Sequence, residues 1–293
     1  DGSYEEKEMK LENENLILET RTRAGEMTSL FDKSKNRELL YQGDQGWSGR
    51  NPTLFPMVGS TWNNGSYTLD GKEYAMKNHG LIRYADLEGS TDGSKIVYTM
   101  DSSEETKAQY PFDFHYEMSY RLEGKKVIIE YAITNTGDQD MPFSFGLHPA
   151  FRTSLTPEEK FEDFSLEMFP KAEAEQIVFF DDFSPVERPT VMLDKWQLSR
   201  EDLKKYATLV FNNIKASKAV LSWKDEPRLA MEFEGYPFLA LWSHPTESDF
   251  VCIEPWFGHA DYEKLEIPFD QREGTQILKP SETFKASYSV EAL

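Results

Sequence analysis

Residues 112–122 read Phe112-Asp113-Phe114-His115-Tyr116-Glu117-Met118-Ser119-Tyr120-Arg121-Leu122. Apolar side chains take every even-numbered position, and polar side chains take the positions between them. Successive side chains of a β-strand point to opposite faces, so this pattern predicts a strand with one buried face. His115 belongs to the polar set and is expected to face solvent or a neighbouring strand.

The same alternation recurs along the chain. A turn at Glu123-Gly124 leads into a second strand with apolar positions at 127, 129, 131 and 133. Asp70-Gly71 predicts a tight turn between 67–69 and 72–74, because both residues tolerate positive φ angles. Further segments are strand-like: 96–100, 220–223, 238–242 and 284–290.

Helical patterning is scarce. One short helix is expected at 199–206, with Ser199 as its N-cap and Asp202 three residues later. No alternation of strands and helices is present. We therefore expect an all-β fold, a large antiparallel β-sandwich with few short helices, forming a single domain over residues 1–293.

The composition limits the possible partners. Of the 293 residues, 39% are hydrophobic and 14% aromatic, enough for a sizeable core, while the net charge is −20 at pH 7. That charge repels phosphate backbones and anionic lipid, so we expect no nucleic-acid or membrane partner. A neutral small molecule is not repelled, and the aromatic side chains suit the apolar face of a sugar.

Two further features bear on the compartment and the redox state. Cys252 is the single cysteine, so no intrachain disulfide is possible, and its apolar neighbours favour a buried hydrophobic role. No apolar stretch approaches the length of a membrane span, and no basic-then-apolar leader opens the chain. We expect a cytoplasmic protein, either a monomer or a homodimer.

Two ionisable residues stand in otherwise apolar segments. Glu254 follows an apolar strand and precedes Pro255, which tends to end strands. Desolvation there would raise the pKa of the carboxyl group and make it a better base; the alternative is a structural carboxylate paired with an arginine. His148 lies between Leu147 and Pro149, and its imidazole is either a proton-transfer group or a core histidine bonded to backbone.

Three more residues are candidates for ligand contact. His79 precedes Gly80, which allows a close backbone approach, and Arg83 follows shortly. Arg50 either binds a ligand or pairs with one of the many carboxylates. The alternative to ligand binding is, for each of them, an ordinary loop residue or a member of a surface ion pair.

The sequence lacks the motifs that mark several other kinds of binding site and active site. The chain has no phosphate-binding loop, no dinucleotide fingerprint and no G-x-S-x-G nucleophile motif. H-x-x-x-H and C-x-x-C are also absent, so we expect no metal and no cofactor.

The ordered series of motifs resembles the aldose 1-epimerase (galactose mutarotase) family, most closely its LacX-type branch. The segments are Asn78-His79-Gly80, His148-Pro149-Ala150-Phe151 and Cys252-Ile253-Glu254-Pro255-Trp256, supported by Leu54-Phe55-Pro56-Met57-Val58-Gly59 and Gly258-His259-Ala260-Asp261. The likeness runs from about residue 11 to the C-terminus. The family fold is a large antiparallel β-sandwich with an open sugar cleft.

The resemblance implies roles for matching positions. Glu254 would be the general base at the anomeric hydroxyl, and His148 the general acid at the ring oxygen. His79 would orient the sugar. Beside these family roles, Arg50, Arg83 and Trp256 are expected as further substrate contacts. The implied activity is interconversion of α and β anomers of a free aldose without a cofactor.

Two departures from the family pattern concern the substrate. Ser60 stands where the family usually has a sugar-contacting arginine, and no acidic residue precedes Leu209-Val210-Phe211, where many relatives carry one. We expect Arg50 and Arg83 to compensate for these departures and to favour a phosphorylated or acidic sugar. The departures make a non-catalytic carbohydrate-binding protein the first alternative. A glycoside hydrolase, which needs two carboxylates flanking the bond, is the second.

Overall fold

The chain folds mainly into antiparallel strands. The structure, a computed structural model, describes residues 8–246 and 248–293. Its largest sheet has the strand order β12-β20-β19-β16-β14-β17-β18-β22-β10-β9-β8-β7, with β13 paired to β20 and β15 to β14. These strands are β7 (Glu88–Thr91), β8 (Lys95–Asp101), β9 (Phe114–Glu123), β10 (Lys126–Asn135), β12 (Phe145–Gly146), β13 (Ala150–Arg152), β14 (Phe164–Ile177), β15 (Thr190–Gln197), β16 (Leu209–Asn212), β17 (Lys218–Trp223), β18 (Glu226–Glu232), β19 (Phe238–Trp242), β20 (Phe250–Phe257) and β22 (Thr283–Ala292).

Smaller sheets and short helices complete the described part of the chain. A four-stranded sheet contains β1 (Glu8–Glu12), β2 (Leu16–Arg21), β3 (Met27–Asp32) and β4 (Arg37–Glu38). Two two-stranded sheets pair β5 (Ser66–Leu69) with β6 (Lys72–Ala75), and β11 (Met141–Phe143) with β21 (Gln276–Leu278). The helices are α1 (Glu104–Gln109), α2 (Arg200–Tyr206) and the 3-10 turns η1 (Ile82–Tyr84), η2 (Phe161–Asp163) and η3 (Phe269–Gln271). None of these helices is long and apolar enough to cross a membrane.

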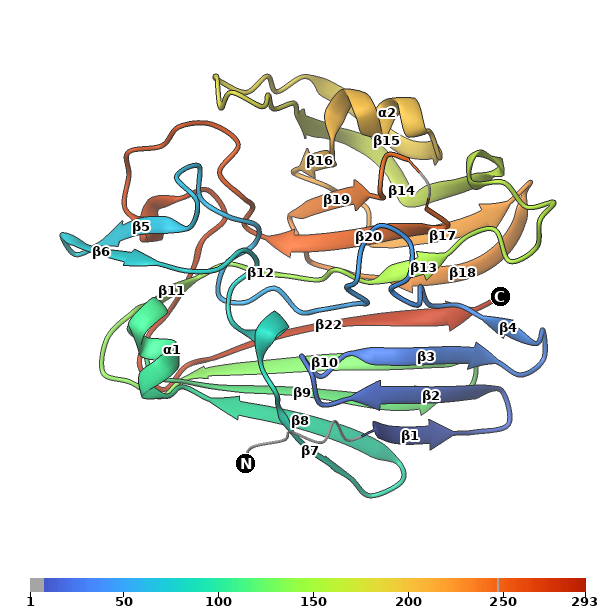
Figure 1. Cartoon of the computed structure of the whole chain (residues 1–293), viewed down its shortest axis with the longest axis horizontal. Coiled ribbons are helices and arrows are strands. Elements are labelled where there is room, and N and C mark those ends of the chain that lie inside the picture. Colours follow the sequence, from blue (N-terminus) through green and yellow to red (C-terminus); the bar gives the residue numbers. More distant parts are fainter. Residues whose placement is uncertain (1–7, 247) are drawn as a thin grey trace.

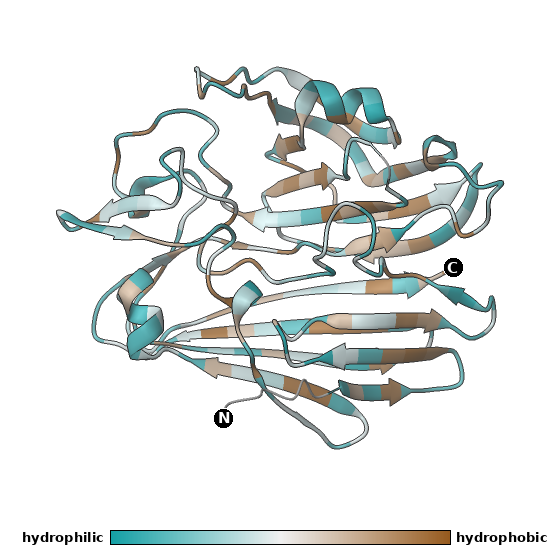
Figure 2. Cartoon of the chain, viewed as in Figure 1, coloured by the Kyte–Doolittle hydropathy of each residue, from teal (hydrophilic) through white to brown (hydrophobic). Residues whose placement is uncertain are grey.

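Two layers of sheet enclose the core. In Figure 1 the four-stranded sheet lies in front of the lower part of the large sheet, and β1 contacts β8 and β9. Leu18 and Leu30 from the small sheet share one buried cluster with Met118 and Ile129 from the large one. Figure 2 shows hydrophobic and hydrophilic residues alternating along many strands, whereas β19 is almost continuously hydrophobic. The predicted antiparallel β-sandwich is confirmed.

The local predictions hold at most positions. β9 and β10 pair as expected, and His115 Nδ1 lies 2.7 Å from Asp101 Oδ1 on the neighbouring β8. The turn at Asp70-Gly71 has the positive φ angles of 50° and 75° that the pair predicts. Ser199 caps α2 by accepting a hydrogen bond from the backbone N–H of Asp202.

The sequence analysis did not find α1. Its capping box joins Ser103 to Thr106, and a threonine at the third helical position is a weaker signal than glutamate or glutamine. The helix has 6 residues, too few for a hydrophobic periodicity to show.

One local expectation is wrong: Pro255 does not end its strand. β20 continues to Phe257, and the carbonyl of Pro255 accepts a hydrogen bond from Leu147 N–H at 3.0 Å. The nitrogen and carbonyl of one strand residue face the same neighbour, so the missing N–H also faces residues 147–149. Residues 147–149 keep the register of β12 and β13, and the pair Leu147–Pro255 retains its one possible hydrogen bond, so the strand continues despite the missing proline N–H.

The turn at His79-Gly80 brings another candidate residue to this region. His79 has a φ of 66° and Gly80 a φ of 83°, both in the left-handed region. A Cβ on Gly80 would lie 2.3 Å from the carbonyl oxygen of Phe55, so the close approach here is to the protein's own backbone. Backbone strain at a non-glycine residue persists only where surrounding contacts fix it, and His79 N–H donates to Gly59 O at 2.8 Å.

We expect Gly80→Ala to destabilise the fold by roughly 3 kcal/mol or more, combining the cost of positive φ with a backbone clash. Gly93→Ala is the matched control: its φ is 89°, but nothing lies within 4 Å of the added Cβ. The control should cost only about 1 kcal/mol. Urea unfolding of both variants measures the difference, and equal losses would contradict the assigned clash.

Candidate functional site

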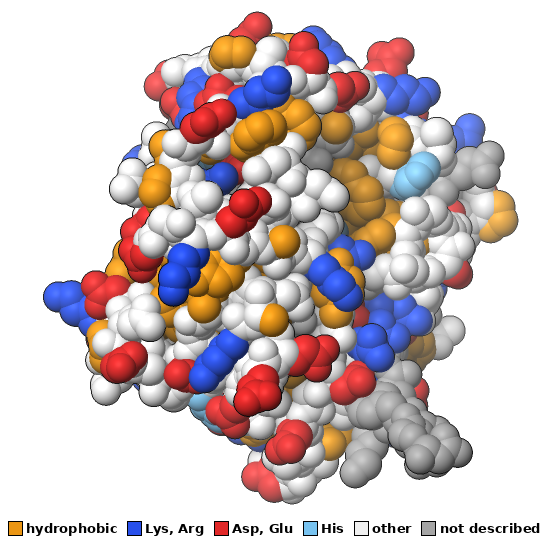
Figure 3. All heavy atoms as spheres, turned by 60° about the vertical axis from the view of Figure 1, so that its left-hand side comes forward, with side chains coloured by type: hydrophobic (Ala, Val, Ile, Leu, Met, Phe, Trp, Pro, Cys, Tyr) orange, Lys and Arg blue, Asp and Glu red, His pale blue; other side chains and the backbone are white. Residues whose placement is uncertain are grey.

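A cavity of about 490 Å³ opens on the face formed by β19 and β20. Ala240 of β19 pairs with Glu254 of β20, and Phe238 pairs with Trp256. Loops from distant parts of the chain supply the walls. The lining residues are Trp47, Gly59, Ser60, Asn78, His79, Arg83, His148, Phe179, Ala207, Thr208, Trp242, Glu254, Trp256, Ala260 and Tyr262. Figure 3 shows a hollow with hydrophobic side chains in its wall and basic side chains grouped beneath it.

Glu254 and His148 meet in this cavity. His148 Nε2 lies 3.3 Å from Glu254 Oε1, and the two residues are 6% and 2% exposed. Glu254 comes from the middle of β20. His148 lies between β12 and β13, and the common register of these two strands places it directly opposite Glu254. Side chains directly opposite each other on neighbouring antiparallel strands lie on the same face, so the strand register brings the imidazole to the carboxyl group.

Burial shifts this pair in opposite directions. It raises the pKa of Glu254 well above 4.5, and the indole N–H of Trp256 opposes the shift. That indole nitrogen is itself buried. Burial lowers the pKa of His148 to about 3, and the charge of Arg83 acts in the same direction. A low-dielectric site thus favours the pair with no net charge, holding one proton between two groups.

His79 is held as a neutral hydrogen-bond donor. Its Nδ1 accepts a hydrogen bond from Gly59 N–H at 2.9 Å, which leaves Nε2 to carry the ring proton. Burial lowers the pKa of His79 well below 6.5, and His148 and Arg83 add to the effect. The ring lies edge-on to His148 with centroids 5.4 Å apart. His79 is thus available to donate to a ligand oxygen.

Two tryptophans in the cavity wall were missed by the sequence analysis. Trp47 lies over His148 with ring centroids 4.6 Å apart, and Trp242 meets Trp47 edge-on at 5.5 Å. Trp47 sits in a loop between Gly46 and Gly49, where no strand pattern marks it. Trp242 ends a strand that was predicted, but its face could be assigned only once β19 was paired with β20. Core packing and ligand contact look alike in sequence for such residues.

The predicted contacts are only partly brought together. Arg83 and Trp256 line the cavity, whereas Arg50 is not among its lining residues. The side chain of Arg50 lies beside Gly43 instead. Ser60 and Ala207 both line the cavity, so the two departures from the family pattern fall at or next to its wall.

One group among the described residues has the geometry for a metal ion. Potential ligand atoms of His148, Cys252 and Glu254 lie within 4.8 Å of one another. Burial raises the pKa of the Cys252 thiol well above 9.0, and the charge of Glu254 raises it further. A protonated thiol is a poor ligand, so the group offers a cation little compensating charge.

The chain matches known proteins along nearly its whole length. Residues 9–291 match the sequence profile of the family described as Aldose 1-epimerase. The chain belongs to the aldose 1-epimerase family. Protein LacX of Lactococcus lactis subsp. lactis is 30% identical over 304 residues, which cover 97% of this chain and 99% of that protein.

Solved structures show the same fold. A galactose mutarotase related enzyme from Lactobacillus acidophilus superposes with a TM-score of 0.90 at 27% identity, covering 98% of this chain and 97% of that one. A galactose mutarotase-like protein from Lactobacillus casei gives 0.88 at 23% identity, covering 98% and 100%. A putative aldose 1-epimerase from Escherichia coli gives 0.70 at 15% identity, covering 99% and 100%.

We expect Glu254→Gln to stabilise the fold by roughly 1–3 kcal/mol, because the wild type holds an ionisable carboxyl group away from water. The folded-state pKa of Glu254 is raised, so the folded protein binds more protons than the unfolded chain above pH 4.5. Its contribution to stability therefore falls as the pH rises, and the advantage of glutamine grows. Urea unfolding at several pH values measures this trend.

Glu117→Gln on β9 is the control, because its carboxylate is exposed. A pH-independent difference between Glu254→Gln and the wild type would contradict the burial argument.

Proposed function

We propose that the protein interconverts the α and β anomers of a free aldose by general acid–base ring opening. The observation that carries the proposal is the 3.3 Å approach of His148 Nε2 to Glu254 Oε1 in a cavity large enough for a sugar ring. Membership of the aldose 1-epimerase family supports the same reaction class.

The reaction needs two coordinated proton transfers. Glu254 takes the proton of the anomeric hydroxyl while His148 delivers a proton to the ring oxygen, so the C1–O5 bond breaks. The open-chain aldehyde then rotates about C1–C2. Reclosure from the other face returns both protons and gives the opposite anomer. Each positioned transfer contributes about 10²–10⁴-fold to the rate.

The working form has a carboxylate and an imidazolium. It contains the same number of protons as the protonated carboxyl with neutral imidazole that burial favours in the empty cavity. A proton has to move only between Glu254 and His148 before the reaction begins. The shared proton thus supplies an acid and a base at neutral pH without a change in net charge.

Other lining residues orient the sugar in this proposal. The Nε2–H of His79 is the donor directed to its oxygens. Trp47 and Trp242 offer aromatic faces to its C–H groups. Arg83 is a fixed positive charge in the lining, so the substrates tested should include sugar phosphates beside neutral aldoses.

A glycoside hydrolase and a non-catalytic sugar-binding protein would each require different residues in the cavity. A glycoside hydrolase uses two carboxyl groups about 5–9.5 Å apart, and Glu254 is the one carboxylate among the described lining residues. A non-catalytic sugar-binding protein is favoured by Ser60, in place of the family arginine, and by the absence of the family's acidic residue near Ala207. The latter alternative keeps the cavity but does not need the His148–Glu254 pair.

We expect Glu254→Gln to lower the rate of anomer exchange by about 10²–10⁴-fold, since the amide cannot take a proton from the anomeric hydroxyl. Sugar binding should remain, because glutamine keeps the size of the side chain. Exchange spectroscopy by NMR measures the rate over a panel of aldoses and sugar phosphates, and calorimetry measures binding. An unchanged rate would favour the binding-protein alternative.

A second expectation concerns pH. Because the pKa of His148 is lowered to about 3, kcat/KM should stay level as the pH falls from 7 to about 4.5. An ordinary imidazole would gain a proton near pH 6.5 and end the plateau there. At high pH the activity should fall when the pair loses its shared proton. The measurement is polarimetry with spontaneous mutarotation subtracted, and an acid limb near 6.5 would contradict the shared-proton arrangement.

A further inference from the structure

The indole of Trp47 covers one face of the His148 ring. The two ring centroids are 4.6 Å apart, and the ring planes lie 30° from parallel. Trp242 and His79 approach the same imidazole at steeper angles, 74° and 76°, with centroids 5.9 Å and 5.4 Å away. Among the described residues, Trp47 is thus the aromatic ring that lies nearest to His148 and most nearly parallel to it.

A glycine-rich loop at residues 42–49 holds the indole in this position. The hydroxyl of Tyr41 donates a hydrogen bond to the carbonyl oxygen of Trp47 and accepts one from the N–H of Gln45 at 2.7 Å. A Cβ on Gly49 would lie 2.2 Å from an indole carbon of Trp47, so the ring folds back over this glycine. Any other residue at position 49 would therefore displace the indole.

The proposed reaction needs a charged His148. Burial lowers the pKa of its imidazole to about 3, and the charge of Arg83 acts in the same direction. Glu254, 3.3 Å away, is the one carboxylate among the described lining residues and attracts an imidazolium. Cys252 and His79 add no negative charge, because burial raises the pKa of the thiol and lowers that of the second imidazole. Negative potential beyond that of Glu254 has to come from the aromatic rings around His148.

The face of Trp47 supplies such a potential. An indole attracts a cation more strongly than the other aromatic side chains do, within about 6 Å of its centroid, and the attraction grows when water is excluded. The observed separation lies inside that range, and His148 is buried. A stabilised imidazolium is a weaker acid. The proton is only partly transferred in the transition state, however, so the gain in the charged population outweighs the loss of acid strength.

We propose that Trp47 is a positioning residue that stabilises the imidazolium form of His148 through the face of its indole. The inference rests on the proposed function, because the imidazolium is needed only if His148 protonates the ring oxygen of a sugar. The indole moves no proton itself. It raises the fraction of the protein in which the shared proton lies on His148 rather than on Glu254. His148 takes one face of the indole, so a sugar contacts the remainder of that ring.

Fluorinated tryptophans test this role. Fluorine withdraws electrons from the indole and weakens its attraction for a cation, while the ring keeps nearly the same size. We expect log kcat for anomer exchange to fall in steps through mono-, di- and trifluorotryptophan, with a total loss of about three- to tenfold. NMR exchange spectroscopy measures the rate on the aldose or sugar phosphate that the wild type exchanges fastest.

The label enters all 6 tryptophans of the chain, so the series needs an internal control. The same series in Trp47→Phe is that control and should show no dependence on fluorine, because the ring over His148 is then unlabelled.

Substitutions at the contact give a second measurement. Trp47→Phe keeps a smaller aromatic face and should lower kcat about threefold, whereas Trp47→Leu keeps none and should lower it about tenfold or more. Gly49→Ala retains the tryptophan but displaces it, and should resemble Trp47→Leu. Gly137→Ala is the matched control for the glycine, because its added Cβ meets its nearest neighbour at an ordinary 3.4 Å. This control should leave kcat unchanged.

The outcomes separate the two proposals. No anomer exchange by the wild type on any sugar of the panel overturns the proposed function and this inference together. Exchange at a rate that does not change with fluorination overturns the role of Trp47 alone. An equal fall in the Trp47→Phe series does the same, because the effect then comes from another tryptophan. A fluorine effect confined to KM also rejects the role, since it assigns Trp47 to sugar contact only.

Discussion

The contact between His148 and Glu254 depends on the register of the sheet edge. β12 and β13 pair with β20 in one unshifted register, which places His148 directly opposite Glu254. Pro149 and Pro255 lack an N–H, so the pairs Pro149–Ile253 and Leu147–Pro255 keep one hydrogen bond each. Side chains directly opposite each other on neighbouring antiparallel strands lie on one face of the sheet, so the imidazole meets the carboxyl group 3.3 Å away.

Burial determines how the His148–Glu254 pair is protonated. Two ionisable groups that are almost fully buried favour the arrangement without net charge, so the pair shares one proton. The same burial has a cost in stability, because one group resists ionisation and the other resists protonation. Functional sites commonly hold such unfavourable arrangements within a rigid scaffold. Here the scaffold is the β19–β20 floor and the rings of Trp47 and Trp242.

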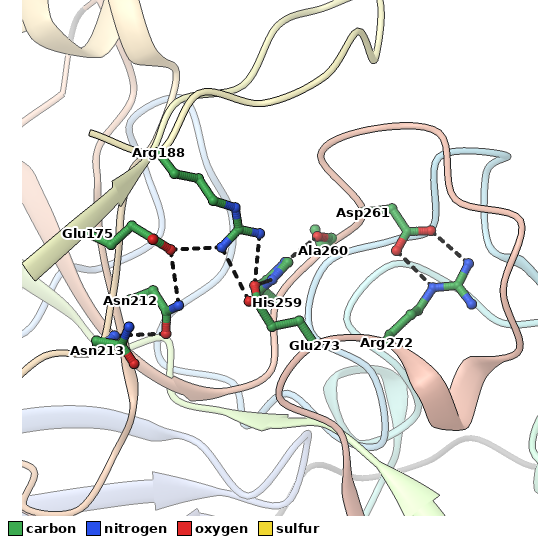
Figure 4. Close-up of polar contacts among 9 residues, drawn as sticks. All are labelled: Glu175, Arg188, Asn212, Asn213, His259, Ala260, Asp261, Arg272 and Glu273. Carbon is green, nitrogen blue, oxygen red and sulfur yellow. Dashed lines mark hydrogen bonds and ion pairs between the residues drawn. The ribbon is translucent and has the colours of Figure 1, made fainter. Parts of the chain in front are cut away.

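Three histidines near the cavity differ in their hydrogen-bond partners. His79 receives a hydrogen bond at Nδ1 and lies near Arg83, so it stays neutral. His148 shares a proton with a buried carboxyl group. His259 lies between the Ala260 carbonyl and the Glu273 carboxylate (Figure 4). Residue type alone does not distinguish these settings; the atoms opposite each ring nitrogen do.

The sequence by itself determined the all-β architecture, the pairing of β9 with β10, and the candidacy of Glu254, His148 and His79. These follow from local patterns, because alternation, turn residues and an ionisable group in an apolar run are all visible within a few positions. Only the tertiary structure decided that Arg50 lies outside the cavity lining, that Trp47 and Trp242 lie within it, and that Pro255 continues its strand. Each of these depends on which distant segment lies opposite, and that is fixed by sheet pairing and loop packing across the whole chain. The acceptors on either side of His259 are of the same kind, since Glu273 reaches it only through the folded loop.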